Sequence, residues 1–265
     1  MAHGINRRLN SQPRTAGMGR RRQRAIALTA LLGLATVPVA ASDQLRQFLI
    51  SRRCVGCDLS DTVLAGANLE DADLSGANLA GANLSQARLP RARMAQANLS
   101  QANLSQAVVS QADLSGSDLT GANLRGATLT GSRLVEVKAT AINLENAEAR
   151  ESNWSGSDLS DSRLDGASFA QAGLAQANLS RATLTDGRLY RANLIGARLD
   201  GVDFTGADLR ETLIRDASVD GANFTNADLY GANLMRTDLS TARFCNTRMA
   251  NGEINNDHCA EPTLP

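Results

Sequence analysis

The sequence has very few aromatic residues, which make up 3% of its 265 positions. An ordinary globular core uses more aromatic side chains, so a core of smaller apolar residues is expected. Histidine is equally scarce, with only His3 and His258, and no Ser-His-Asp or Cys-His set is available. The sequence also lacks a phosphate-binding glycine motif and four zinc ligands in one place. We therefore predict no enzyme, no catalytic residue, no cofactor and no metal site.

The sequence also lacks a long hydrophobic run. The longest, residues 25–37, has 13 residues, whereas a membrane span needs about 20. It follows the basic segment 20–24 and precedes Val39-Ala40-Ala41, where small residues suit a signal peptidase. This order predicts a secretory signal peptide at residues 1–41, with no membrane span after cleavage. An uncleaved anchor or a basic tail is the alternative.

Outside this predicted signal peptide, the sequence has no basic region. The whole chain has a net charge of zero, but residues 1–41 contain seven arginines and no acidic residue. The remainder has 20 basic and 27 acidic residues, a net charge of −7. This balance gives no reason to expect a nucleic-acid partner.

What the sequence does contain is a five-residue repeat from Cys57 to Glu253. A representative piece runs Ala72-Asp-Leu-Ser-Gly, Ala77-Asn-Leu-Ala-Gly. A large or apolar residue stands at every fifth position from 59 to 254, giving 40 units without an insertion. This period matches neither a helix nor a strand, and units this short must stack on one another. The repeat therefore predicts a solenoid.

The pattern Ala-(Asn/Asp)-Leu-polar-Gly resembles the pentapeptide-repeat family. The resemblance implies an all-β fold, a right-handed quadrilateral β-helix of about ten coils over residues 54–254. Residues twenty apart would then stack, with Leu and Ala inside. The Asn and Asp side chains are expected to bond to backbone at the turns and to one another along each stack.

Both ends of the repeat carry features that predict caps. Residues 42–53 are expected to form a short capping helix, with Ser42 as N-cap and Leu45, Phe48 and Leu49 on one face. Residues 255–265 form a tail. A disulfide between Cys245 and Cys259 would fold this tail over the open end and add about 3 kcal/mol.

The pair Cys54 and Cys57 falls on the Leu and Ala positions, so both sulfurs should point inward. In an exported protein a disulfide that pins the helix is favoured, and a redox-active pair is the alternative. The segment 48–59 resembles the entry to the repeat in exported cyanobacterial pentapeptide-repeat proteins. That resemblance implies a periplasmic or thylakoid-lumen location.

Residues 135–153 are the least regular part of the repeat. Ala139 and Ala149 stand where Leu is usual, and Trp154 then takes a Leu position. We expect a locally repacked coil, in which small neighbours admit the large side chain. The alternative is a bent or binding segment that carries Glu145, Glu148, Arg150 and Glu151.

The surface feature that stands out lies in the C-terminal half. With twenty residues per coil, Tyr190, Arg210 and Tyr230 form one outward column. Aromatic, arginine and exposed aliphatic side chains are typical of protein interfaces. The alternative is drift on a tolerant surface. The complete candidate partner surface comprises Tyr190, Ile195, Arg210, Leu213, Arg215, Tyr230 and Met235.

These features favour an exported, non-enzymatic scaffold or protein-binding module. One alternative is a DNA-mimicking protein that binds a topoisomerase such as gyrase, as some members of the family do. The leader, the cysteines and the interspersed arginines count against it, because gyrase is cytosolic. The other alternative is a purely structural rod without a specific partner. The sequence specifies no oligomeric state.

Overall fold

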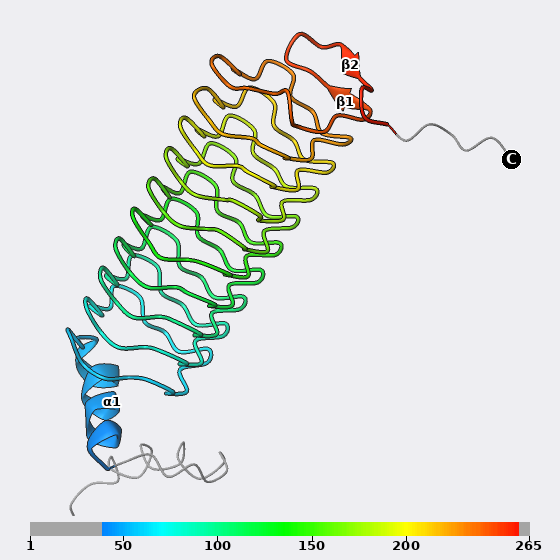
Figure 1. Cartoon of the computed structure of the whole chain (residues 1–265). Coiled ribbons are helices and arrows are strands. Elements are labelled where there is room, and N and C mark those ends of the chain that lie inside the picture. Colours follow the sequence, from blue (N-terminus) through cyan, green and yellow to red (C-terminus); the bar gives the residue numbers. More distant parts are fainter. Residues whose placement is uncertain (1–38, 260–265) are drawn as a thin grey trace, which may run out of the picture. The chain divides into compact units, whose positions relative to one another are not determined.

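The computed structural model describes residues 39–259, which comprise one helix, a stack of coils and a small hairpin (Figure 1). Helix α1 (Val39–Ser51) lies at one end of the stack. Strands β1 (Thr247–Arg248) and β2 (Ile254–Asn255) lie at the other end. Most of the predicted signal peptide and the end of the predicted tail, residues 1–38 and 260–265, lie outside the described residues.

The coils are joined by parallel bridges between residues twenty positions apart, from Arg53↔Asp73 to Asp228↔Arg248. The N–H of Leu99, for example, donates to the carbonyl of Asp118 in the following coil at 2.7 Å. The N–H of Asn98 donates to the carbonyl of Ala77 in the preceding coil at 2.9 Å. Because each bridge involves a single residue between two turns, continuous strands do not form along the coils. The pairing is that of a β-helix solenoid, in which each coil contacts only its neighbours.

The corners of the coils place every fifth residue in the left-handed region. Gly121 has φ 65°, but Gln101 and Ala141 at equivalent corners have φ 59° and 56°. This conformation costs a residue with a side chain about 1–2 kcal/mol, whereas glycine adopts it freely. The Gly-or-polar fifth position of the repeat is thus a backbone requirement that much of the chain meets without glycine.

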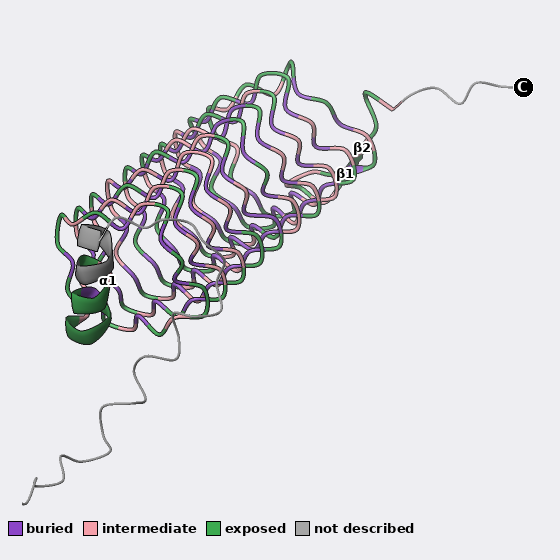
Figure 2. Ribbon diagram, turned by 90° about the horizontal axis from the view of Figure 1, so that it is seen from below, coloured by how far each residue is buried: buried purple, intermediate pink, exposed green. Residues whose placement is uncertain are grey.

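The interior is made of stacked Leu-position and Ala-position side chains, which are buried along the solenoid (Figure 2). One stack changes to phenylalanine near the C-terminal end. The rings of Phe204 and Phe224 stack with centroids 5.2 Å apart, and those of Phe224 and Phe244 with centroids 5.6 Å apart. This end of the core is therefore built of larger, flatter side chains than the rest.

Trp154 occupies its Leu position without disturbing the stack. It is fully buried with Ala139 and Ala149, and the parallel bridges continue through the same coil. Its Nε1 donates to Ser152 Oγ at 2.7 Å, and its ring meets Phe169 edge-on at 6.0 Å. Two alanines in place of leucines offset the larger ring, so the prediction of a repacked coil is confirmed.

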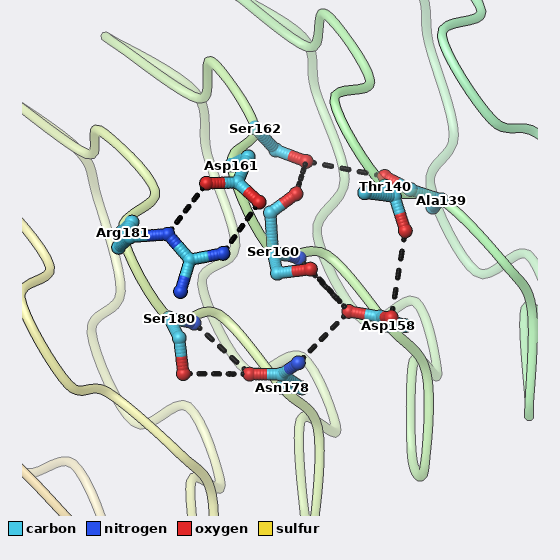
Figure 3. A network of polar contacts seen from close by, with 9 residues as sticks. All are labelled: Ala139, Thr140, Asp158, Ser160, Asp161, Ser162, Asn178, Ser180 and Arg181. Atoms are coloured by element: carbon cyan, nitrogen blue, oxygen red, sulfur yellow. Dashed lines mark hydrogen bonds and ion pairs between the residues drawn. The ribbon is translucent and has the colours of Figure 1, made fainter.

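Polar side chains form ladders on the outside of the stack, as predicted (Figure 3). Asp158 Oδ1 accepts from the backbone N–H of Ser160 at 3.1 Å and from Asn178 Nδ2 of the next coil at 3.0 Å. At a nearby corner, Arg181 donates twice to Asp161, at 2.7 and 2.6 Å. Each turn is thus held both within its coil and to its neighbour.

Helix α1 covers a different range from the predicted 42–53. It begins at Val39, so Ser42 lies inside it, and it ends at Ser51 because Arg52 has φ 55° and donates its N–H to Phe48 at 2.7 Å. Phe48 is buried against the first coil, and Leu45 packs beside it. Leu49, about 100° further round the helix, is exposed and does not share their contact.

The solenoid also ends earlier than the repeat frame. Ile254 stands on a Leu position, but it lies in β2, paired antiparallel with Arg248 and exposed. The chain turns back at Gly252, where φ is 91°, and the N–H of Met249 donates to the carbonyl of Glu253. The prediction that residue 254 continues the core is therefore wrong, because this turn carries it out of the stack.

Candidate protein-binding surface

Seven side chains predicted to form a partner surface lie on two adjacent sides of the C-terminal coils. The tyrosine column comprises Tyr190, Arg210 and Tyr230. Its members stack because the N–H groups of Arg191 and Glu211 donate to the carbonyls of Arg210 and Tyr230, each at 3.0 Å. The apolar side comprises Ile195, Leu213, Arg215 and Met235, where Leu213 is bridged to Asn193 below and Asn233 above.

Tyr190 is held in place by charged neighbours. The guanidinium carbons of Arg191 and Arg210 lie 4.9 and 5.7 Å from its ring centre. Its hydroxyl donates to Glu211 Oε1 at 3.3 Å, and Glu211 also accepts from Arg191 Nε at 2.7 Å. The hydrogen bond from Arg191 is the main reason that the pKa of Glu211 lies below its ordinary value. These contacts therefore fix the orientation of the Tyr190 ring in the unbound protein.

The rest of the tyrosine column is arranged in the same way. Arg210 makes two hydrogen bonds to Asp208, each of 2.7 Å, which lower the pKa of that carboxyl. Tyr230 is 47% exposed, and the guanidinium carbon of Arg248 lies 4.3 Å from its ring centre. Arg248 is in turn 3.5 Å from Asp228. These fixed aromatic rings offer contact area at little cost in side-chain entropy.

The apolar side has a different character. Leu213 and Met235 are exposed, while Arg215 and Ile195, which lie one and two coils before Met235 in the same column, are partly buried. The Nε of Arg215 is buried and has no hydrogen-bond partner within residues 39–259. A buried donor without a partner costs about 1–3 kcal/mol.

Exposed large hydrophobic residues occur only near the two ends of the described chain. Between residues 64 and 212 the described surface has none. The N-terminal group is Leu49, Ile50, Val55 and Val63, and the C-terminal group is Leu213, Tyr230, Met235 and Ile254. Single exposed hydrophobic residues need no explanation, but their concentration in one region does.

Sequence reasoning did not identify the charged partners of the tyrosines, namely Arg191, Glu211, Asp208 and Arg248. The repeat itself contains the signal, since Asp208 and Glu211 flank Arg210 and Arg191 follows Tyr190 directly.

Charged residues of the irregular segment 135–153 already form ion pairs within the described chain. Glu145 is buried and pairs with Arg125 at 3.2 Å and with Arg163, and Glu148 pairs with Arg150 at 3.1 Å and Arg188 at 3.0 Å.

The four cysteines form two disulfides in the structure, Cys54–Cys57 and Cys245–Cys259. Cys54 is buried and Cys57 packs at the edge of the core, beside the end of α1. The second disulfide joins residues 14 positions apart and holds the C-terminal segment against the last coil. There His258 donates its N–H to the carbonyl of Phe244 at 2.8 Å.

The described residues contain no cluster of three or more His, Cys, Asp or Glu side chains arranged to hold a metal ion. Within the same part of the chain, no helix is both long and apolar enough to cross a membrane. Hollows lie at both ends of the described stack. One is lined by Leu234, Met249 and Ile254 together with polar residues that include Glu253 and Asp257. The other is lined by four arginines and two aspartates, Arg52, Arg53, Arg91, Arg93, Asp71 and Asp73.

Comparison with protein-family models matches the pentapeptide repeats, in segments that cover residues 57–134 and 142–251. The chain belongs to the pentapeptide-repeat family. Membership agrees with the β-helix solenoid described above and points to no catalytic family. Members are in general non-enzymatic structural or binding proteins.

Several solved structures are similar to this chain. HetL, a pentapeptide-repeat protein involved in heterocyst differentiation regulation in the cyanobacterium Nostoc sp. strain PCC 7120, is 30% identical; the match covers 81% of this chain and 98% of HetL, with a TM-score of 0.37. Full-length QnrB1, a plasmid-mediated fluoroquinolone resistance protein, is 21% identical over 75% of this chain and 92% of its own, with a TM-score of 0.36. A protein from the thylakoid lumen of Arabidopsis thaliana is 27% identical over 40% of this chain and 68% of its own, with a TM-score of 0.26. A comparison with proteins of curated function found no match.

Proposed function

We propose that the protein is an exported, non-enzymatic scaffold that binds a partner protein through the tyrosine column and the adjoining apolar side. The observation that carries this proposal is the exposure of Tyr230, Leu213 and Met235 together on the C-terminal coils, beside coils that expose no large hydrophobic residue between residues 64 and 212. Tyrosine and arginine are the residues most enriched where protein interfaces bind tightly. No enzyme chemistry is needed for this role.

The electrostatics of the surface favour a protein partner over a nucleic acid. Arg210 of the tyrosine column is already paired with Asp208, and the neighbouring Arg191 is paired with Glu211. A phosphate backbone would have to compete with these carboxylates, whereas a protein surface can use the exposed rings and the guanidinium faces.

We also infer the finer architecture and the location. Twenty-residue pairing is four five-residue units, which supports a quadrilateral β-helix of about ten coils. Its right-handed sense is what the family resemblance implies. The predicted leader at 1–41 and the two disulfides support export to the periplasm or thylakoid lumen, where thiols are oxidised. The part of α1 after the predicted cleavage point, residues 42–51, and the segment after residue 254 would then act as caps of the mature solenoid.

The experiment is an affinity capture from the exported fraction of the native cell, comparing wild type with the double variant Tyr190→Ser/Tyr230→Ser. We expect at least one partner to be lost from the variant. The matched control is Ser100→Ala/Thr120→Ala, which changes two outward residues on another side of the stack and should retain the partner. Equal capture by all three proteins would contradict the proposed surface, and a protein found only in the cytosol with free thiols would contradict export.

A further inference from the structure

A hollow lies between the last coil and the C-terminal hairpin. Its volume is about 440 Å³, and its large apolar residues are Leu234, Met249 and Ile254. Leu234 and Met249 are partly buried, and Ile254 is exposed. The volume lies near the lower end of the range for ligand pockets, about 300–1,000 Å³. The hollow therefore has room for one long side chain with its flanking backbone, and not for a folded domain.

The other side chains of the hollow are mostly polar, and the charged ones are all negative. They belong to Ala250, Asn251, Glu253, Asn255, Asn256 and Asp257, so no arginine or lysine lines the hollow. Neither Glu253 nor Asp257 forms an ion pair within residues 39–259. The carboxylates beside the tyrosine column differ, because Asp208 and Asp228 are each paired with an arginine.

Both carboxylates of the hollow are oriented by an asparagine two residues earlier. Asn251 Nδ2 donates to Glu253 Oε2 at 2.7 Å, and Asn255 Nδ2 donates to Asp257 Oδ2 at 2.9 Å. The backbone N–H groups of Glu253 and Asp257 donate back to the two amide oxygens, at 3.0 and 2.8 Å. The second oxygen of each carboxylate accepts no hydrogen bond from the described residues. Each carboxylate is therefore held in place by a neutral group and keeps one oxygen for a cationic donor.

The hollow adjoins both parts of the proposed partner surface. Leu234 directly precedes Met235 of the apolar side. In the turn of the hairpin, a Cβ added at Gly252 would lie 3.5 Å from the ring of Tyr230, so the hairpin packs against the tyrosine column. A partner that covers Tyr230 and Met235 would therefore also reach the hollow.

We propose that the partner protein inserts an arginine side chain into this hollow. The aliphatic stem packs on Leu234 and Met249, and the guanidinium donates to the free oxygens of Glu253 and Asp257. Arginine fits because it is weakly hydrated and carries five donors, enough for two carboxylates. An acidic side chain would be repelled, and an apolar one would desolvate the carboxylates without pairing them. This inference rests on the proposed partner-binding function and names the chemistry that the partner supplies.

The test uses acetyl-arginine methylamide and its citrulline analogue, which has nearly the same shape and no charge. Binding to the oxidised full chain is followed by NMR of isotope-labelled methionine methyl groups. Met249 lies in the hollow, Met235 lies beside it, and Met94 is fully buried in the core. The arginine compound should shift the Met249 methyl signal in a saturable way and leave that of Met94 unchanged. The citrulline compound should bind about fivefold more weakly, as expected for an exposed ion pair.

Variants of matched shape locate the binding. Glu253→Gln/Asp257→Asn removes both charges and should weaken the arginine compound about fivefold or more. The control Asp238→Asn removes a carboxylate from the last coil that does not line the hollow, and it should bind as wild type does. Tyr190→Ser should also bind as wild type does, because Tyr190 lies two coils before Tyr230. The result with the compound is therefore independent of the tyrosine column.

The capture experiment separates this inference from the proposed function. Loss of the partner from Tyr190→Ser/Tyr230→Ser but not from Glu253→Gln/Asp257→Asn would retain the tyrosine column and overturn the arginine site. The opposite pattern would retain the arginine site and contradict the tyrosine column.

Three further outcomes would overturn the proposal. One is equal binding of the arginine and citrulline compounds. Another is an equal loss of binding in Asp238→Asn, which would assign the effect to the overall negative charge of this end. The third is a Met249 methyl signal that shifts with protein concentration in the absence of any compound, which would assign the hollow to a second copy. Residues 260–265 contain Glu261 and no basic residue, so this segment cannot supply the cation itself.

Discussion

The coils between residues 64 and 212 and the C-terminal segment 213–259 share one repeat frame but differ in what they expose. The first has a core mainly of Leu and Ala and no large hydrophobic residue on its described surface. The second has Phe224 and Phe244 in the core and Leu213, Tyr230 and Met235 outside. The frame constrains only the inward positions, so outward positions can acquire a binding role without altering the fold.

One side of the solenoid shows the same contrast in its charges. The residues that form the parallel bridges on this side alternate strictly between arginine and aspartate up to residue 133. Beyond residue 133 they carry no charge. In order, the column is Arg53, Asp73, Arg93, Asp113 and Arg133, followed by Asn153, Gly173, Asn193, Leu213 and Asn233. Alternating charges one coil apart attract each other along the stack. The uncharged half loses that attraction and has fewer charges to desolvate on binding.

The largest expected difference between the two regions is in the core. Phe224→Ala leaves a cavity between two stacked rings and should cost about 3–5 kcal/mol, whereas Leu104→Ala in the same column should cost about 2–5 kcal/mol. Hydrogen exchange resolved along the chain is the measurement, because a repeat protein need not unfold as one unit. Phe224→Ala should speed exchange chiefly after residue 200. Uniform acceleration along the whole solenoid would contradict a separately stabilised C-terminal region.

The two disulfides give the next largest effect. Cys245–Cys259 closes a loop of about 15 residues and should contribute about 3 kcal/mol, while the much shorter loop of Cys54–Cys57 should contribute about 2 kcal/mol in the same chain-entropy treatment. Paired serine variants at each end are compared by denaturant unfolding. The variant at 245 and 259 should also speed exchange at Phe244 and Asn246, whose N–H groups the cap satisfies. A larger loss at the N-terminal end would reverse this ranking.

The corners should behave alike in both regions, which makes them a control for the comparison. Ala141→Gly should stabilise the protein by about 1 kcal/mol, because alanine is strained at φ 56°. Gly221→Ala should destabilise it by about the same amount, since a Cβ there meets no atom within 4 Å and only the backbone conformation is disfavoured. Thermal unfolding measures both changes. Opposite shifts of similar size are expected, and unequal ones would show that the corners are not equivalent along the chain.

The sequence predicted the interior well because burial leaves few choices at a five-residue spacing. The Leu and Ala positions, the side-chain ladders and the accommodation of Trp154 by Ala139 and Ala149 all follow from it. The ends were predicted less well. Helix α1 extends across Ser42, and Ile254 leaves the core at the turn of Gly252.

These misses have a common physical cause. A terminal residue lacks a coil on one side, so local turn geometry outweighs the repeat pattern. The corners were missed for a different reason, since a polar residue in the sequence does not reveal whether its φ is positive. The packing of Arg191 and Arg248 on the tyrosine rings depends on side-chain conformation, which spacing alone does not specify.

The smallest effect distinguishes the carboxylates of the two regions. The pKa of Asp208 is lowered chiefly by hydrogen bonds from Arg210, and that of Asp73 chiefly by the hydroxyl of Ser75. A lowered folded-state pKa contributes stability that is fully present above the unfolded-state value and is lost as the pH falls through the folded-state value. Each group should therefore contribute at most about 1 kcal/mol, and this contribution disappears in acid.

Salt should separate these two carboxylates, because it screens an ion pair more strongly than a hydrogen bond from a neutral hydroxyl. NMR titration of the carboxyl carbons at low salt and at about 1 M salt, where charges are screened within about 3 Å, provides the measurement. The pKa of Asp208 should rise towards its ordinary value at high salt by more than that of Asp73. Arg210→Gln should remove most of this salt response at Asp208 and leave Asp73 unchanged. If both carboxylates responded to salt equally, the charge on Arg210 would not be what holds the pKa of Asp208 low, and the tyrosine column would lack the fixed ion pair on which its rigidity depends.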